Sequence, residues 1–235
     1  MSPERNFSVE HRAAMYAALG DVSRLRIVDT LMLGDAAPSE LAAMLQMPSN
    51  LLAHHLNALE SAGLVERRRS EGDGRRSYLH LRPDTPALPQ PSPVNTPPRM
   101  LFVCTGNSAR SHLAAALWRR ASTVPATSAG THPVAAIDPG AIEVARRRGL
   151  PMPRRRPRHL ADVLQPDDLV VAVCDLAHEE LAHHELAREE LVPTARLHWS
   201  VADPVRQGKR AAFDAAFSDL ADRVDRLAGL LPQPS

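Results

Sequence analysis

The chain has 235 residues, of which 44% are hydrophobic and 3% aromatic, and its formal net charge is +1 at pH 7. This length suggests one large or two small domains. The near-zero charge excludes any argument from an overall basic or acidic surface. The two cysteines, Cys104 and Cys174, are too few for a disulfide framework and fit a reducing compartment. No run approaches the ~18 apolar residues of a membrane span, and the first residues lack the apolar core of a signal peptide. We therefore expect a cytoplasmic protein without membrane association.

Residues 1–82 predict short helices followed by a hairpin. Ser8 and Asp21 are suitable N-cap residues for apolar patterns over residues 9–19 and 22–33. Two further helices are predicted over residues 41–45 and 49–62. Two runs at residues 64–69 and 76–81 flank a Glu-Gly-Asp-Gly turn, which is a strand–turn–strand signal. Two helices at helix-turn-helix spacing followed by a basic hairpin predict a winged helix.

Two motifs in this part carry a family resemblance. They are Ala-Leu-Gly-Asp-x-x-Arg-Leu-Arg-Ile-Val at residues 18–28 and His-His-Leu-x-x-Leu-x-x-Ala-Gly-Leu-Val at residues 54–65. They resemble the ArsR (SmtB-type) winged-helix repressors, which bind operator DNA as dimers and usually release it when a metal or metalloid binds.

The resemblance implies that the helix over residues 49–62 enters the major groove while hairpin arginines meet phosphates or the minor groove. An alternative for the arginines is a solvated edge strand that blocks aggregation. The expected DNA-binding residues are Ser49, Asn50, Ala53, His54, Arg67, Arg68, Arg69, Arg75 and Arg76.

The N-terminal part departs from that family in two ways. Residues 1–103 contain no cysteine, so soft metals and arsenite have no thiolate ligand there, and we expect no metal site. The family's C-terminal dimer helix is also missing, because the chain passes from the hairpin into prolines. A homodimer is still expected, and it would rest on the helix over residues 9–19 or on the other domain.

Residues 83–98 contain seven prolines and almost nothing to bury. Such a segment predicts a semi-extended spacer of polyproline type. An alternative is a peptide ligand for an aromatic groove of a partner. The predicted domains are therefore a winged helix over residues 1–82, a linker over residues 83–98, and a second domain over residues 99–235.

The second domain alternates strands and helices, which predicts an α/β unit with a four-stranded parallel sheet. Strands are expected at residues 100–103, 124–128, 168–173 and 197–199. Helices are expected at residues 112–121, 139–148, 177–190 and 210–231. Cys104, Cys174 and Asp203 each follow a predicted strand, and functional groups in such sheets gather at the carboxyl ends of the strands.

The segment from Cys104 to Ser111 predicts a seat for a tetrahedral oxyanion. A strand that feeds a tight loop opening a helix directs several backbone N–H groups, and the positive end of the helix dipole, at one point. Arg110 follows Cys104 by six residues, and its planar guanidinium can hold two oxygens of the anion. The same field favours the thiolate of Cys104, a nucleophile for phosphorus or arsenic. The expected anion-binding residues are Thr105, Gly106, Asn107, Ser108, Ala109 and Ser111.

The sequence Val-Cys-Thr-Gly-Asn-Ser-Ala-Arg-Ser at residues 103–111, with Asp203-Pro204 later in the chain, resembles the low-molecular-weight protein tyrosine phosphatases and the arsenate reductases that share their fold. This resemblance implies that Cys104 is the nucleophile and that Arg110 holds the anion. It also implies that Asp203 protonates the leaving oxygen and that Asn107 and Ser111 position the loop.

Three features favour an arsenate reductase. Val205 and Arg206 stand where the tyrosine phosphatases place an aromatic pair, and His-Trp-x-x-x-Asp-Pro at residues 198–204 resembles the thioredoxin-coupled reductases. Cys174 matches the position of their resolving cysteine, although a small apolar filler at a strand end is the alternative.

Leu181 occupies the position of the third cysteine of those reductases. The reductant would therefore be thioredoxin acting directly, or glutathione or mycothiol, with no bound cofactor. Two alternatives stay open: a low-molecular-weight phosphatase, and a non-catalytic repressor that senses an oxyanion such as arsenate or phosphate.

Overall fold

The computed structural model describes residues 8–82, 96–152, 155–185 and 195–231. The chain divides into two compact units, which are described separately here. Most of the proline-rich segment lies outside the described residues, so its conformation and the predicted domain boundaries stay predictions. In the described part of the chain, no helix is long and apolar enough to cross a membrane.

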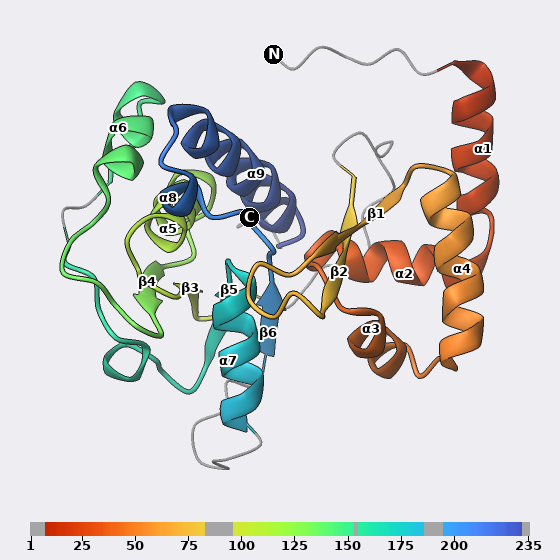
Figure 1. The fold of residues 1–235 in the computed structure, drawn as a ribbon, viewed down its shortest axis with the longest axis horizontal. Helices are drawn as coiled ribbons and strands as arrows, with labels where there is room; N and C mark the ends of the chain where they lie inside the picture. Colours follow the sequence, from red (N-terminus) through yellow and green to blue (C-terminus); the bar gives the residue numbers. More distant parts are fainter. Residues whose placement is uncertain (1–7, 83–95, 153–154, 186–194, 232–235) are drawn as a thin grey trace. The chain divides into compact units, whose positions relative to one another are not determined.

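The N-terminal unit is a winged helix-turn-helix, as predicted (Figure 1). Its strands β1 and β2 pair antiparallel, with Val65 opposite Leu81 and Arg69 opposite Ser77. The elements in chain order are α1 Val9–Leu19, α2 Val22–Leu33, α3 Pro38–Met44, α4 Ser49–Ser61, β1 Val65–Arg69 and β2 Ser77–Leu81.

The expected N-caps of the first two helices are present. Ser8 Oγ accepts from the His11 N–H at 3.2 Å, and Asp21 Oδ1 accepts from the Arg24 N–H at 2.9 Å. Helix α3 begins three residues earlier than predicted, because a proline at its first position and Glu40, which accepts from the Ala37 N–H at 2.8 Å, stabilise that start. The helices and strands of this unit share one apolar cluster. Its most deeply buried members are Met15, Ile27, Val28, Leu31, Leu41, Leu52, Leu56, Leu59, Leu64 and Leu79.

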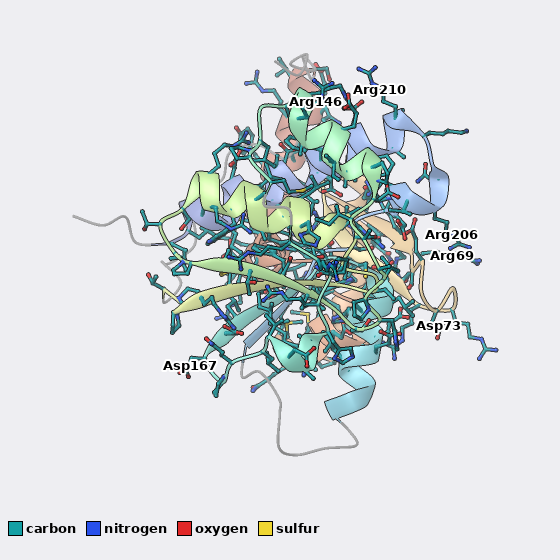
Figure 2. The ribbon with its side chains drawn as sticks, turned by 90° about the vertical axis from the view of Figure 1, so that its left-hand side faces the viewer. Arg69, Asp73, Arg146, Asp167, Arg206 and Arg210 are labelled. Atoms are coloured by element: carbon teal, nitrogen blue, oxygen red, sulfur yellow. The ribbon has the colours of Figure 1, made fainter. Side chains whose placement is uncertain are left out.

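The C-terminal unit contains the predicted four-stranded parallel sheet, with strand order β4-β3-β5-β6. Helices α5 and α9 pack on each other, with α5 against β3 and β4, whereas α7 packs against β3 and β5. Figures 1 and 2 show α5 and α7 on opposite faces of the sheet. The elements are β3 Arg99–Cys104, α5 Arg110–Ala121, β4 Ala126–Gly130, α6 Pro139–Arg147, the 3-10 turn Leu160–Asp162, β5 Asp168–Ala172, α7 Asp175–Glu185, β6 Ala195–His198, α8 Pro204–Gln207 and α9 Arg210–Gly229.

Several boundaries in this unit differ from the prediction. Strand β4 begins two residues later, because Pro125 has no N–H to donate and only its carbonyl accepts, from the Met100 N–H at 2.8 Å. Helix α7 begins at Asp175, directly after Cys174, and the predicted continuation to residue 190 lies outside the described residues. The short helix α8 was not predicted, although Asp203 caps its start and Gly208, with φ of 63°, ends it.

Both faces of the sheet are covered, so the central strand β3 is buried from Met100 onward and β5 is buried throughout. Every residue of β5 is buried, as expected for a parallel sheet with helices on both sides. The ring of Phe102 on β3 lies 6.0 Å from that of Trp118 and 5.7 Å from that of Trp199. This rigid core brings the carboxyl ends of β3, β5 and β6 to one edge of the sheet.

Candidate functional site

The loop between β3 and α5 pairs its backbone carbonyls and leaves several backbone N–H groups without a protein acceptor among the described residues. Asn107 adopts φ of 47°, a left-handed conformation that asparagine tolerates better than most residues. The loop carbonyls point away and are paired: Thr105 O accepts from the His132 N–H at 2.9 Å, and Gly106 O from the Val134 N–H at 3.0 Å. Helix α5 has no side-chain N-cap. Within the described residues, the N–H groups of residues 106–109 donate to no protein acceptor. They are therefore available to an anion, as the sequence predicts.

A buried polar network holds this loop and its cysteine. Cys104 lies at the end of β3, with Sγ 3.1 Å from Ser111 Oγ. Asn107 Nδ2 donates to Ser111 Oγ at 2.8 Å, and Asn107 Oδ1 accepts from the Arg158 N–H at 2.9 Å. The structure thus brings Cys104, Asn107 and Ser111 together as expected, while the contribution of Arg158 has no signature in the sequence.

Gly130, at the end of β4, allows the loop to lie directly against the edge strand. A Cβ at this position would lie 2.6 Å from Thr105 O and 3.0 Å from Asn107 N. A methyl group therefore does not fit without displacing the anion loop. The sequence analysis did not use the Ser-Ala-Gly sequence at the end of this strand, although its glycine could have indicated a close backbone contact.

Arg110 is buried, and residues that follow β6 hold its guanidinium. Its NH1 donates to Val201 O at 2.8 Å, and its NH2 donates to Asp203 Oδ2 at 2.9 Å. Burial opposes the charge of the guanidinium, but the nearby Cys174, Cys104 and Asp203 outweigh it and raise the pKa of Arg110. The other oxygen of Asp203 accepts from the Val205 N–H at 2.9 Å and so starts α8. The structure brings the predicted anion holder and the predicted acid into direct contact.

Cys174 lies beside the anion loop. It follows β5, which pairs with β3, and its Sγ lies 3.6 Å from Thr105 Oγ1. Burial is the main reason that the pKa of Cys174 is raised to about 11, and Cys104 adds to the effect while Arg110 and Thr105 oppose it. Cys174 is therefore a protonated thiol at neutral pH, placed next to the residue that follows Cys104.

Asp175, the residue after Cys174, forms a buried acid–imidazole pair with His198 that the sequence analysis did not predict. Asp175 Oδ1 lies 3.0 Å from His198 Nε2, and the ring of His178 stacks on that of His198 at 4.1 Å between centroids. Burial disfavours the carboxylate, yet hydrogen bonds from His198 and Ser200 outweigh this and lower the pKa of Asp175. The signal was present, because Asp175 follows the second cysteine directly and His198 opens the His-Trp motif.

In the N-terminal unit, the candidate DNA-reading residues of α4 are exposed on one face. Ser49 and Ala53, like Asn50 and His54, are four residues apart, which places them on neighbouring positions of the helix surface. His55 is instead buried, with Nδ1 3.7 Å from Asp21 Oδ1. The paired histidines therefore divide into one that packs and one that faces outward.

Two of the candidate wing arginines contact carboxylates of their own unit. Arg67 Nε and NH2 each lie 3.3 Å from Glu60 Oε1, and Arg68 pairs with Glu66. Exposed pairs of this kind contribute at most ~1 kcal/mol, so phosphates can displace them. Within the described ranges, no group of three or more His, Cys, Asp or Glu side chains is arranged to hold a metal ion.

Two family models match the sequence. The model described as low molecular weight phosphotyrosine protein phosphatase matches residues 99–233, and the model described as bacterial regulatory protein, arsR family, matches residues 21–67. These matches confirm both resemblances and the predicted fold class. They also confirm an enzyme of the phosphatase or arsenate-reductase kind joined to a DNA-binding helix-turn-helix.

Solved structures of the same fold are similar to the C-terminal unit. The tyrosine phosphatase AmsI of Erwinia amylovora is 23% identical with a TM-score of 0.50, and the match covers 58% of this chain and 95% of that one. The arsenate reductase of Archaeoglobus fulgidus is 27% identical with a TM-score of 0.45, covering 55% and 98%. The tyrosine phosphatase Wzb of Escherichia coli K30 is 24% identical with a TM-score of 0.49, covering 57% and 97%. Among curated proteins, none matches the sequence significantly.

Proposed function

The chain belongs to the low molecular weight phosphotyrosine protein phosphatase family, and within it we propose that this protein is an arsenate reductase fused to a regulator of transcription. The observation that carries the proposal is the position of Cys174. Its sulfur lies 3.6 Å from Thr105 Oγ1, in the residue next to Cys104. A hydrolytic phosphatase has no need of a second thiol at this point.

In the first step, the Cys104 thiolate attacks the arsenic of arsenate held by the loop N–H groups and Arg110. An arsenic–sulfur bond forms, and one arsenate oxygen leaves as water after the Asp203 carboxyl donates a proton. The contact between Arg110 NH2 and Asp203 Oδ2, at 2.9 Å, keeps the anion holder and the acid on the same side of the site.

In the second step, the Cys174 thiolate attacks Cys104 Sγ. A sulfur–sulfur bond forms as the arsenic–sulfur bond breaks, and the electron pair of that bond stays on arsenic, which is reduced from As(V) to As(III) and leaves as arsenite. The Cys104–Cys174 disulfide is then reduced by two electrons from thioredoxin, or from glutathione or mycothiol.

The raised pKa of Cys174 fits this order of events. While Cys104 is free, burial of Cys174 is the main reason that its thiol stays protonated, the neighbouring Cys104 adds to the effect, and a protonated thiol does not attack. In the arsenic adduct the sulfur of Cys104 carries no charge of its own, so its contribution to the raised pKa of Cys174 is lost, while the contribution of burial remains.

The first test is arsenite production by the purified chain, with thioredoxin and with low-molecular-weight thiols supplied separately. We expect turnover with one of these donors and its loss in Cys104→Ser; arsenite formation by that variant would overturn the proposal. Cys174→Ser should abolish reduction while p-nitrophenyl phosphate hydrolysis is retained. An equal loss of both activities would instead assign Cys174 to packing.

A second candidate, a phosphatase, is favoured by Leu181. This residue is buried in α7 at the position of the third cysteine of the thioredoxin-coupled reductases, so the chain cannot pass its disulfide on to another thiol of its own. Hydrolysis of the Cys104 adduct by water needs no second cysteine. Hydrolysis of p-nitrophenyl phosphate with no arsenite formed from either donor would establish this candidate.

For the N-terminal unit, we propose operator binding as a homodimer, through the exposed face of α4 and the wing arginines. An electrophoretic shift with the DNA upstream of its own gene, repeated with arsenate and arsenite, tests this proposal. We expect a shift that weakens with increasing salt, because arginine–phosphate contacts release counterions. A shift that does not depend on salt, or no shift, would contradict it.

A further inference from the structure

A basic cleft lies in the C-terminal unit, and its lining contains none of residues 104–111. It has a volume of about 710 Å³ and lies between α5, the segment that joins α5 to β4, the edge strand β4, and residues 155–158. We call it the β4 cleft. Its lining residues with polar side chains are His112, Arg119, Ser122, Thr123, Thr127, Ser128, Arg155 and Arg158.

The β4 cleft gathers three guanidinium groups without a carboxylate among its described lining residues. Arg158 NH2 donates to Thr127 Oγ1 at 2.7 Å, and Arg119 Nε donates to Ala126 O at 3.4 Å, so neutral groups hold both side chains in place. Burial lowers the pKa of Arg119, and repulsion from Arg155 lowers it further. Like charges held this close favour an anion between them.

A buried histidine forms part of the same wall. His112 is 6% exposed, its Nδ1 lies 3.5 Å from Ser128 Oγ, and its Nε2 is buried with no hydrogen-bond partner among the described residues. Burial lowers the pKa of His112 to about 4; the Asn107 carbonyl partly opposes this, and Arg119 and Arg158 lower it further. An unpaired buried nitrogen costs free energy unless a ligand or water satisfies it.

The cleft is connected to the catalytic loop through the backbone of Arg158. The Arg158 N–H donates to Asn107 Oδ1 at 2.9 Å, and the Arg158 carbonyl accepts from the Gly130 N–H at 2.9 Å. Asn107 in turn donates to Ser111, whose hydroxyl contacts Cys104. An anion that moves the guanidinium of Arg158 can therefore also shift the Arg158 backbone, which is hydrogen-bonded to Asn107 in the loop between β3 and α5.

We propose that the β4 cleft is a second oxyanion site, which takes a phosphate group, either free or as the monoester of a small molecule, and which acts on the anion loop through Arg158. The three arginines supply the charge, and the neighbouring hydroxyls supply further donors. A dianion there neutralises the mutual repulsion of the arginines. The site is independent of whether the catalytic loop reduces arsenate or hydrolyses phosphate.

The test is equilibrium dialysis of the full chain carrying Cys104→Ser, so that no probe is turned over. One arm uses inorganic phosphate and the other uses adenosine monophosphate. We expect two phosphates per chain in this background, one after Arg119→Ala with Arg155→Ala, and two after Arg120→Ala with Arg156→Ala. The second pair removes the same charge from neighbouring exposed positions that do not line the cleft.

The comparison of the two probes identifies the source of the phosphate group. Inorganic phosphate filling both sites assigns the cleft to the free anion, whereas a second equivalent only with the nucleotide assigns it to a monoester. One equivalent with both probes, or equal binding by the two paired variants, would overturn the proposal.

A spectroscopic measurement tests the site independently of stoichiometry. Saturating phosphate should raise the pKa of His112 above about 4, because a nearby anion offsets the field of the arginines. NMR of the ring nitrogens of His112 measures this pKa. The paired variant Arg119→Ala with Arg155→Ala should show no such response to phosphate. A His112 signal that phosphate does not move in the Cys104→Ser chain would contradict the assignment.

Discussion

Gly130→Ala tests how closely the edge strand supports the catalytic loop. The new Cβ would lie 2.6 Å from Thr105 O, which must retreat by roughly 0.8 Å to reach an ordinary van der Waals contact. Overpacking of this kind costs ~1–3 kcal/mol, and displacement of a reacting group by about 1 Å costs ~100-fold in rate. We therefore expect kcat for p-nitrophenyl phosphate hydrolysis to fall by roughly two orders of magnitude, with Tm lowered by about 4–12 °C.

Gly140→Ala is the matched control. Its Cβ would lie 2.4 Å from the Phe213 ring, so it overpacks the contact between α6 and α9 without touching the loop. We expect a comparable loss in Tm with kcat at 25 °C unchanged. A Gly130→Ala protein with the kcat and Tm of the parent would refute the reasoning, and so would equal losses of activity in both variants.

Three further predictions concern other parts of the chain. Arg99→Ala removes the guanidinium that holds the buried carboxylate of Asp168 at 2.6 Å, so urea denaturation should show a loss of ~3–5 kcal/mol; an unchanged midpoint would contradict a buried pair. The pKa of Cys174 lies near 11, so its thiolate fraction rises as pH rises, and single-turnover arsenate reduction should increase up to tenfold per pH unit from pH 7; a flat profile would exclude Cys174 as the attacking thiol. Arg68→Ala should lower the salt dependence of operator binding by about one counterion, whereas Asn57→Ala, at an exposed position in the second half of α4, should leave the slope unchanged.

The parts of this protein that the sequence predicts are those with local causes. Ser8 and Asp21 cap helices through donors three residues away, and apolar patterns locate the strands to within a few residues. Helix α8 was missed because its four residues carry no periodic pattern, although Asp203 and Gly208 mark its two ends. The strand order β4-β3-β5-β6 agrees with the predicted parallel sheet, but alternation of elements by itself does not specify which strands are neighbours.

Among the candidate catalytic residues, those that are neighbours in the sequence were predicted together, whereas contacts between distant residues were not. The loop from Cys104 to Ser111 is continuous in sequence, so its motif alone indicates the family and predicts an oxyanion seat. The contacts that complete it join residues far apart: Arg110 with Val201 and Asp203, and Thr105 with Cys174.

The sequence alone thus indicated the two families and the types of element, and it predicts the nucleophile. Tertiary structure decided which distant groups meet, such as Gly130 against Thr105 O and the arginines of the β4 cleft around His112. The physical reason is that these contacts depend on strand register, helix packing and close steric fit across the fold. A spacing along the chain reports local backbone preference, whereas a charge cluster or a methyl-sized clearance exists only after the sheet and helices have packed.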